Sequence, residues 1–181
     1  MKIGILGAGG IGSNVAVNLV RSGVSNLKIV DFDRIDLSNL NRQFYFYDQI
    51  GRSKVEALKE NLERIAPNLN LEIIDIKIEK NNIKKYFDDC DILVEAFDKK
   101  EYKKLLIEEF SSSNKLIVSA SGIADHDIEN ISIKKFREKI YIVGDFKKGI
   151  ERYKTYSPKV MVVASMMSNI IMEKGGYYEK I

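Results

Sequence analysis

The chain has 181 residues, 45% of them hydrophobic and 30% charged, and a formal net charge of +3. This length is enough for one hydrophobic core, so we expect a single domain over residues 1–181, and the small, dispersed charge argues against a nucleic-acid binder. No apolar run approaches the roughly 18 residues of a membrane span, and the first residues enter a strand without the regions of a signal peptide, so we expect no membrane partner and a cytoplasmic location.

Short apolar runs alternate with amphipathic stretches through the first two thirds of the chain. The runs predict β-strands at residues 2–6, 27–30, 71–76, 92–94 and 116–119. Apolar residues recur at helical spacing at 55–65 and at about 102–110. This alternation predicts βαβ units, and the continuously apolar runs at 92–94 and 116–118 are typical of strands buried on both faces.

The last third of the chain has a different pattern. Residues 128–133 and 140–143 predict two later strands that can pair antiparallel, and a broad apolar helix face follows from Pro158 onward. The chain is therefore expected to have a Rossmann-like α/β fold, with a mostly parallel sheet, helices on both faces and antiparallel strands near the C-terminal end. The apolar helix would close the core or form the interface of a homodimer.

A glycine-rich loop follows the first strand. Residues 7–12 read GAGGIG, a G-x-G-x-x-G that opens a helix. Gly7 would permit the tight turn, Gly9 the approach of a phosphate to the backbone, and Gly12 close packing of helix and strand. Free N–H groups at the helix start, where Gly10 lies, would then face the anion. The alternative is a tight turn with no ligand.

The second predicted strand ends at Asp31, about 20 residues after the loop, where a carboxylate can accept hydrogen bonds from ribose hydroxyls. Loop and acid together predict a nucleotide site. They do not separate NAD from ATP, because both nucleotides present a ribose and phosphates.

A second pattern follows, of the form D-x-D, S-N-L-x-R-Q and G-x-x-K, in residues 31–33, 38–43 and 51–54. It resembles the superfamily of ThiF, MoeB and ubiquitin-activating enzymes. The specific motifs extend from residue 2 to about residue 122, with only general similarity beyond. The resemblance implies that the nucleotide is ATP.

Three side chains of this pattern suit a triphosphate, which carries more charge than one helix terminus neutralises. Arg42 offers a planar fork of N–H donors, Lys54 a mobile point charge, and Asn39 an uncharged amide donor. The alternatives are that Arg42 and Lys54 are solvated surface charges and that Asn39 caps a short helix.

The resemblance also assigns Asp98, just after the strand at 92–94, to hold Mg²⁺ against the phosphates, since a hard cation prefers oxygen ligands. Arg42, Lys54 and Asp98 are thus the expected catalytic residues. Many relatives have asparagine directly after this aspartate and arginine five positions beyond it, where this chain has Lys99 and Lys103. Lys103 keeps the charge without the fork geometry, so no role is assigned to it.

The reaction implied by the resemblance is attack of a carrier protein's C-terminal glycine carboxylate on the α-phosphate of ATP, releasing pyrophosphate. A carboxylate is already nucleophilic at neutral pH, so no general base is needed. The short chain, the missing zinc ligands and the run 41–51 look most like the compact second family of bacterial ThiF proteins. That family implies a small ubiquitin-like sulfur carrier of the ThiS type, in thiamin thiazole biosynthesis.

Two further features follow from the resemblance. The basic segment 144–158, with Lys147, Lys148, Arg152 and Lys154, would be a crossover that guides an acidic carrier, or otherwise a solvated loop. Because the chain starts at its first strand, we expect it to lack the N-terminal helices from which larger relatives send an arginine into the partner subunit's site.

The only cysteine, Cys90, excludes an internal disulfide and any zinc site that needs several thiolates, so no zinc is expected. Nearby carboxylates in the run 88–91 raise the pKa of a thiol, and Cys90 is expected to be structural. The only histidine, His126, lies in a polar stretch and is expected to be a loop residue.

Other functions stay open on the sequence alone. An NAD-dependent oxidoreductase would use the same loop and Asp31, but it would need a substrate domain for which the chain is short. A non-catalytic scaffold is disfavoured by the retained Arg42, Lys54 and Asp98. ATP-dependent activation of a molybdopterin carrier or of a tRNA-linked carboxylate would use the same chemistry, and the modest net charge disfavours tRNA.

Overall fold

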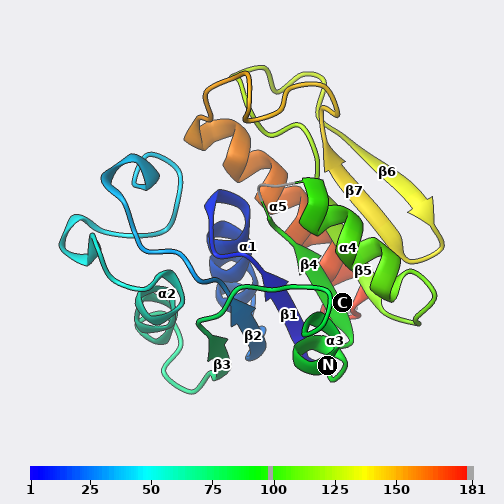
Figure 1. Ribbon diagram of the computed structural model, residues 1–181, viewed down its shortest axis with the longest axis horizontal. Helices are drawn as coiled ribbons and strands as arrows, with labels where there is room; N and C mark the ends of the chain where they lie inside the picture. The colour runs from blue at the N-terminus through cyan, green and yellow to red at the C-terminus, as the bar shows by residue number, and fades with distance from the viewer. Residues whose placement is uncertain (98–99, 179–181) are drawn as a thin grey trace.

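The computed structural model describes residues 1–97 and 100–178. In chain order the elements are β1 (Ile3–Leu6), α1 (Gly10–Arg21), β2 (Asn26–Val30), η1 (Leu37–Asn39), η2 (Tyr47–Gln49), α2 (Lys54–Glu63), β3 (Asn70–Ile74), α3 (Ile83–Phe87), β4 (Ile92–Glu95), α4 (Lys100–Phe110), β5 (Leu116–Ala120), β6 (Ser132–Arg137), β7 (Ile140–Gly144) and α5 (Ser157–Lys174), where η marks a 3₁₀ turn. Figure 1 shows their arrangement.

Within the described residues, seven strands form one sheet in the order β3-β2-β1-β4-β5-β7-β6. β1 lies at the centre, with Ile5 opposite Ile29 of β2 on one side and opposite Val94 of β4 on the other. All neighbours are parallel except β6 and β7, which form an antiparallel pair at one edge. The expected mostly parallel sheet with an antiparallel end is confirmed.

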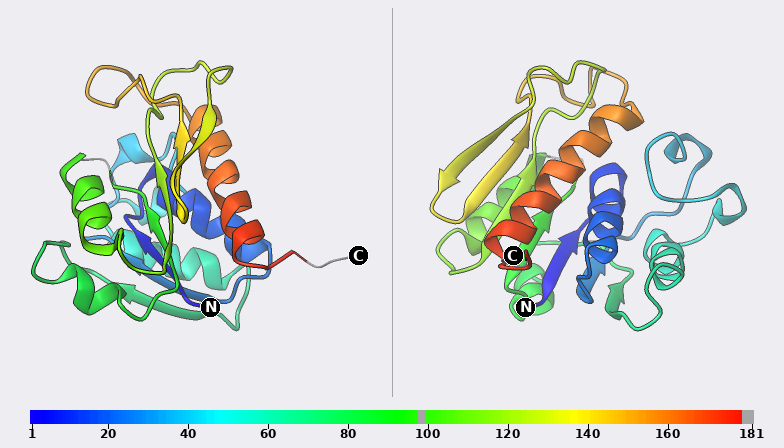
Figure 2. Two further views of the ribbon diagram at one scale, coloured as in Figure 1. Left: turned by 90° about the vertical axis from the view of Figure 1, so that its right-hand side faces the viewer. Right: turned by 180° about the vertical axis from the view of Figure 1, so that it is seen from behind.

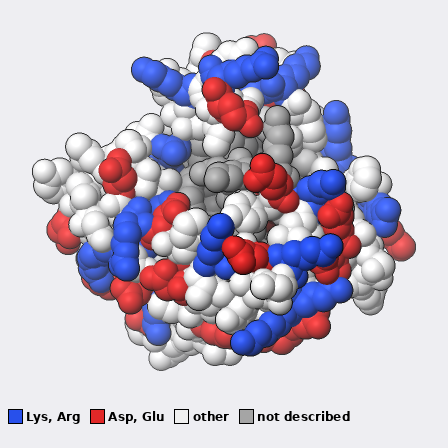
Figure 3. Space-filling view, in the orientation of Figure 1, with Lys and Arg blue, Asp and Glu red and all other residues white. Residues whose placement is uncertain are grey.

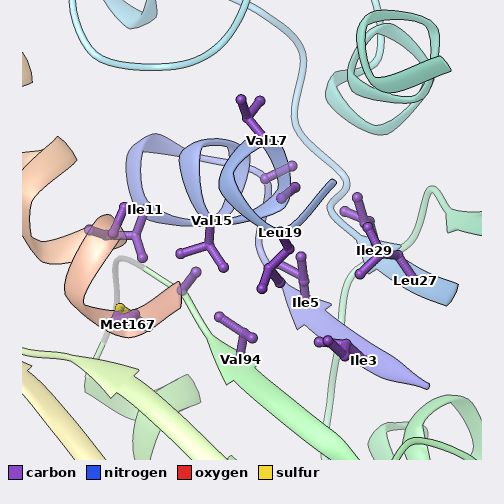
Figure 4. Close-up of a cluster of buried hydrophobic side chains, with 14 of the residues drawn as sticks. Ile3, Ile5, Ile11, Val15, Val17, Leu19, Leu27, Ile29, Val94 and Met167 are labelled. Carbon is purple, nitrogen blue, oxygen red and sulfur yellow. The ribbon is translucent and has the colours of Figure 1, made fainter. Parts of the chain in front are cut away.

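Helices cover both faces of the sheet because alternate strand residues point to opposite sides. Ile3 and Ile5 of β1 pack with α1, α2 and α5 in one hydrophobic cluster, whereas Leu6 packs with α3 and α4 in another. Figure 4 shows the first cluster, in which Leu19 of α1 lies beside Ile5 of β1. Both faces are thus buried, as the continuous apolar runs predicted.

Some predicted boundaries were wrong. The strand expected at 128–133 is β6, which starts at Ser132 and ends at Arg137, while residues 128–131 form a turn closed by a 3.3 Å bond from Ile131 N–H to the Ile128 carbonyl. Every side chain of β6 is exposed, so this edge strand carries no apolar alternation. The helix expected at about 102–110 is α4, which starts at Lys100, whereas α3 and η2 were not predicted.

The carboxyl ends of the parallel strands meet at one edge of the sheet, the upper edge in Figure 1. The segment from residue 31 to residue 53 extends to one side of this edge, and residues 145–156 cross above it from β7 to α5 (Figures 1 and 2). Among the described residues, no helix has both the length and the apolar character needed to cross a membrane.

Candidate nucleotide site

The glycine loop connects β1 to α1 in a geometry that only glycine allows at two positions. Gly7 has a φ of +100°, in the region that L side chains avoid, and its N–H donates to the Val30 carbonyl at 2.8 Å. A Cβ atom added to Gly12 would lie 1.8 Å from the Gly7 carbonyl oxygen. The helix start therefore lies directly against the turn, and α1 begins at Gly10 with Gly9 as its N-cap.

Two buried side chains hold the turn between Gly7 and Gly9. Asp31 accepts from the Ala8 N–H at 2.6 Å, and the Tyr45 hydroxyl donates to the Ala8 carbonyl at 2.7 Å. Burial raises the pKa of Asp31 above its usual value, although Lys54 and the Ala8 and Asp33 N–H groups oppose this shift. Burial likewise raises the pKa of Tyr45, with Asp31 adding to it. The loop is thus preorganised.

Arg42 and Gln43 lie beside the start of α1. The nearest Arg42 atoms to a Cβ added at Gly10 are Cγ and Cδ, at 3.5 and 3.6 Å, while its guanidinium donates to the Ser38 carbonyl at 3.1 Å. A Cβ added at Gly9 would lie 3.8 Å from Gln43 Nε2. Asn14 Nδ2 fixes this arrangement by donating to the Gly10 and Arg42 carbonyls at 2.7 and 2.8 Å.

The Gln43 side chain is only 8% exposed. Within the part of the chain that the structure describes, its Oε1 is the buried side-chain atom with no hydrogen-bond partner. Such an atom costs free energy unless a ligand or water meets it. Together with the N–H groups at the start of α1, this buried amide fits a polar ligand such as a nucleotide phosphate group with its bound solvent.

Lys54 is the first residue of α2, and its side chain is only 7% exposed. Its ammonium lies 2.8 Å from the Asp33 carboxylate, which is half exposed. Lys54 also lowers the pKa of Asp31, so its charge acts on the carboxylate that holds the glycine loop. The alternative that Lys54 is a solvated surface charge is therefore wrong.

Asn39 ends η1, where its Oδ1 accepts from the Asp36 N–H at 3.2 Å while Asp36 accepts from the Ser38 N–H at 2.8 Å. Asp36 is therefore the N-cap of this turn, and Asn39, weighed from the sequence as the cap, completes the capping box as its third residue. The Asn39 carbonyl also accepts from the N–H groups of Arg42 and Gln43 at 3.1 and 2.9 Å. Asn39 thus holds the turn that carries these two residues.

A cavity of about 490 Å³ lies at the carboxyl edge, beside the glycine loop. Its floor comes from the ends of β4 and β5 and its roof from the crossover segment, and the lining residues are Ile11, Ala96, Phe97, Lys103, Ala120, Ser121, Gly122, Ile123, Phe146, Lys147, Gly149, Ile150, Glu151 and Arg152. Since Ile11 belongs to the first turn of α1, the cavity adjoins the phosphate end of the predicted nucleotide site.

The crossover is fixed to the rest of the chain at several points. Lys159, fully buried at the start of α5, donates to Asp145 and to the Ala124 carbonyl, both at 2.6 Å. Lys148 forms an ion pair with Asp125, and the Asp125 N–H donates to the Lys154 carbonyl at 2.7 Å. Basic side chains remain on its outer surface, and Figure 3 shows them gathered along the upper rim.

Two of the predicted features lie outside this site. Cys90 is 1% exposed, and burial with the nearby Asp89 raises its pKa to about 12, in keeping with a structural thiol. His126 is an exposed loop residue whose Nδ1 lies 2.6 Å from Asp125. Asp98, the predicted magnesium ligand, lies outside the described residues. Among residues 1–97 and 100–178, no group of three or more His, Cys, Asp or Glu side chains is placed to hold a metal.

The sequence did not predict three residues whose hydrogen bonds hold the parts of this site in place. Tyr45, Asn14 and Glu95 carry no motif that marks them, because each acts through contacts with residues far away in the chain. One of them could have been suspected, because Glu95 is an acidic residue at the end of an apolar, buried strand. A buried carboxylate needs a partner.

The ThiF family profile matches residues 1–174. Molybdopterin-synthase adenylyltransferase of Haemophilus influenzae is 32% identical over 123 residues, which are 67% of this chain and 51% of that protein. The adenylyltransferase and sulfurtransferase UBA4 of Candida glabrata is 33% identical over 123 residues, which are 28% of its length. The aligned segment thus spans about half or less of these relatives.

Solved structures show the same fold. The Escherichia coli tRNA N6-threonylcarbamoyladenosine dehydratase TcdA in complex with ATP superposes with a TM-score of 0.83 at 20% identity, over 98% of this chain and 88% of that one. Escherichia coli MccB with ATP gives a TM-score of 0.77 at 25% identity, over 98% of this chain and 57% of that one.

Proposed function

Because the chain belongs to the ThiF family, we propose that it uses ATP to adenylylate the C-terminal glycine carboxylate of a small ubiquitin-like carrier protein. The observation that supports this most directly is the cluster at the start of α1. There the glycine loop, Arg42 and the buried amide of Gln43 come together beside a cavity at the sheet edge. In this proposal residues 1–181 form a single adenylation domain.

The nucleotide would lie along the upper edge of the sheet. The N–H groups of Gly9, Gly10 and the following turn, with Arg42 and Lys54, would bind the phosphates, and Asp31 would accept from the ribose. Lys54 would have to exchange its contact with Asp33 for a phosphate oxygen. Asn39 would act by holding the turn of Arg42 and by offering its amide.

Asp98 remains the proposed magnesium ligand, and Mg²⁺ would supply neutralisation of phosphate charge. Glu95, three residues earlier, does not compete for that role. Glu95 is fully buried and has partners on both oxygens.

In the proposed reaction, a carboxylate oxygen of the carrier bonds to the α-phosphorus of ATP. The bond from that phosphorus to the bridging oxygen breaks, and pyrophosphate leaves with the electron pair. No proton has to be removed from the carboxylate at neutral pH, so alignment and charge stabilisation carry the catalysis. The buried Cys90, remote from the site, leaves sulfur transfer to another protein.

We further propose that the carrier is of the ThiS type. The basic side chains of the crossover support an acidic partner: Lys147, Arg152 and Lys154 are exposed, and the first two also line the cavity. The named relatives favour other carriers, including that of molybdopterin synthase. We also propose a homodimer, supported by the exposed Met161 and Val162 on α5.

The test is carrier-dependent exchange of pyrophosphate into ATP, measured with ThiS-type and molybdopterin-type carriers in parallel. Exchange with the ThiS-type carrier is expected, with collapse in Asp98→Ala and a fall of about 10²- to 10³-fold in Arg42→Ala. Exchange only with the molybdopterin-type carrier would correct the carrier and keep the chemistry. No exchange with any carrier or with tRNA, together with tight NAD binding, would overturn the proposal.

A further inference from the structure

A buried carboxylate with a complete set of partners lies at the end of β4. Glu95 is 0% exposed. Its Oε2 accepts from the Ser119 hydroxyl at 2.5 Å and from the Lys103 ammonium at 2.8 Å, and its Oε1 accepts from the Phe97 N–H at 2.9 Å. Buried carboxylates are stable only when paired and hydrogen-bonded in this way, so Glu95 strongly restrains the position of Lys103.

Lys103 connects this buried group to the cavity. Its side chain is 25% exposed, and it lines the 490 Å³ space beneath the crossover. An ammonium has three N–H donors, and one of them is directed at Glu95. Lys103 therefore lines the cavity from a position held by Glu95 rather than on a freely moving side chain.

The cavity suits the end of an extended peptide. It has room for a few small residues, and cavities of this size typically enclose a small ligand. One end reaches Ile11, next to the N-terminus of α1 where the phosphates are proposed to lie, and Lys103 lies on the wall. A carboxylate at Lys103 would therefore be close to the proposed phosphate site.

We propose that Lys103, positioned by Glu95, binds the C-terminal carboxylate of the carrier and orients it for attack on the α-phosphate. This inference rests on the adenylylation activity proposed above. Lys103 donates to one carboxylate oxygen and keeps its proton, while the other oxygen forms the bond to phosphorus and pyrophosphate leaves. Because the Glu95–Lys103 pair is neutral overall, it directs the carboxylate without adding net charge to the site. Lys103 would be a catalytic residue and Glu95 a positioning residue.

The first experiment separates carrier binding from nucleotide binding in four variants. Lys103→Gln is expected to raise the KM for the carrier and to lower kcat/KM by about 10- to 100-fold, because a charge-assisted hydrogen bond is lost. Its affinity for ATP, measured by calorimetry, should stay within about twofold of the wild-type affinity. Lys103→Arg should recover most of the loss, and Glu95→Gln, with folding checked by thermal melting, should fall between them. Lys104→Gln on the same helix, whose partner Glu108 is exposed, is the matched control and should match wild type.

The second experiment needs no turnover. Binding of a synthetic peptide with the carrier's last seven residues is compared in its free-acid and C-terminal amide forms by fluorescence anisotropy. Wild type is expected to prefer the acid and Lys103→Gln to lose that preference. An unchanged preference in the variant, no preference in wild type, or an equal loss of ATP affinity would overturn the role of Lys103. Absence of exchange in wild type would instead overturn the proposed function.

Discussion

The ammonium of Lys54 lies 2.8 Å from the carboxylate of Asp33, and the Lys54 side chain is only 7% exposed. The start of α2 thus places a cation close enough to Asp31 to lower its pKa. Replacing Lys54 by alanine is expected to lower pyrophosphate exchange by about 10²- to 10³-fold, because a preorganised charge at the phosphates is lost. The matched control in the same assay is Arg52→Ala, two residues before Lys54. It removes an exposed cation that is paired with Glu60, and its activity should stay near that of wild type.

The glycine loop predicts opposite outcomes for two alanine substitutions. Gly12→Ala places a Cβ 1.8 Å from the Gly7 carbonyl oxygen, so we expect a loss of about 2–3 kcal/mol in the free energy of unfolding, measured with urea. Gly9→Ala places its Cβ no closer than 3.8 Å to Gln43 and should fold normally. It should nevertheless weaken ATP binding, since the methyl group occupies the approach of the phosphate. Equal stability of the two variants would contradict this account.

Asp31 predicts a pH dependence of nucleotide binding. Its pKa is raised by burial, so as the pH falls it is protonated, and loses acceptor capacity for ribose, earlier than an ordinary aspartate. ATP affinity should therefore decline on acidification, starting above the ordinary pKa of 3.8.

The free energy of unfolding should depend on pH in the opposite sense. The contribution of Asp31 to stability is present below the ordinary pKa and is lost as the pH rises through the raised pKa of the folded state. Calorimetric titration with ATP at each pH measures the affinity, and urea unfolding at each pH measures the stability. Asp31→Asn should show neither dependence.

The buried ion pair of Lys159 and Asp145 is expected to contribute to the stability of the fold by holding the crossover. Lys159→Met leaves the buried Asp145 carboxylate without its cation and should cost about 3–5 kcal/mol in unfolding free energy. Lys159→Met/Asp145→Leu should recover only part of this loss, because the Lys147 and Lys148 N–H groups then lose their acceptor. Lys174→Met, which breaks an exposed pair with Glu173, is the control and should have no measurable effect.

The same pair predicts acid sensitivity. Burial raises the pKa of Asp145, but the Lys159 ammonium and two backbone N–H groups lower it by more, so the net shift is downward. A lowered pKa gives stability that is present above the ordinary value of 3.8 and is lost as the pH falls through the shifted value. Thermal melts of wild type between neutral pH and pH 3 should show this loss, and the double variant should lose less.

Cys90 is expected to be dispensable for adenylylation. Its thiol is buried and has a pKa of about 12, so it is neither accessible nor ionised near neutral pH. Cys90→Ala should retain exchange activity, and native wild type should react with a thiol reagent only after denaturation. Rapid labelling of the native chain would show that this region opens.

The sequence alone determined the features that depend on local pattern. Gly7, Gly12 and Asp31 fall at the spacing of a strand, turn and helix, and the buried strands were visible as continuous apolar runs, because backbone geometry and burial act on neighbouring residues. The exposed edge strand β6 lacks such a pattern and was misplaced. The roles of Arg42, Lys54 and Asp98 came from resemblance and remain proposals.

Only the tertiary structure decided which polar groups meet. The contacts of Tyr45 with Ala8, of Lys103 with Glu95 and of Lys159 with Asp145 join segments 8 to 37 residues apart. No local preference encodes such pairs. They form because folding removes these groups from water, and each then requires a partner that the packing of distant elements supplies.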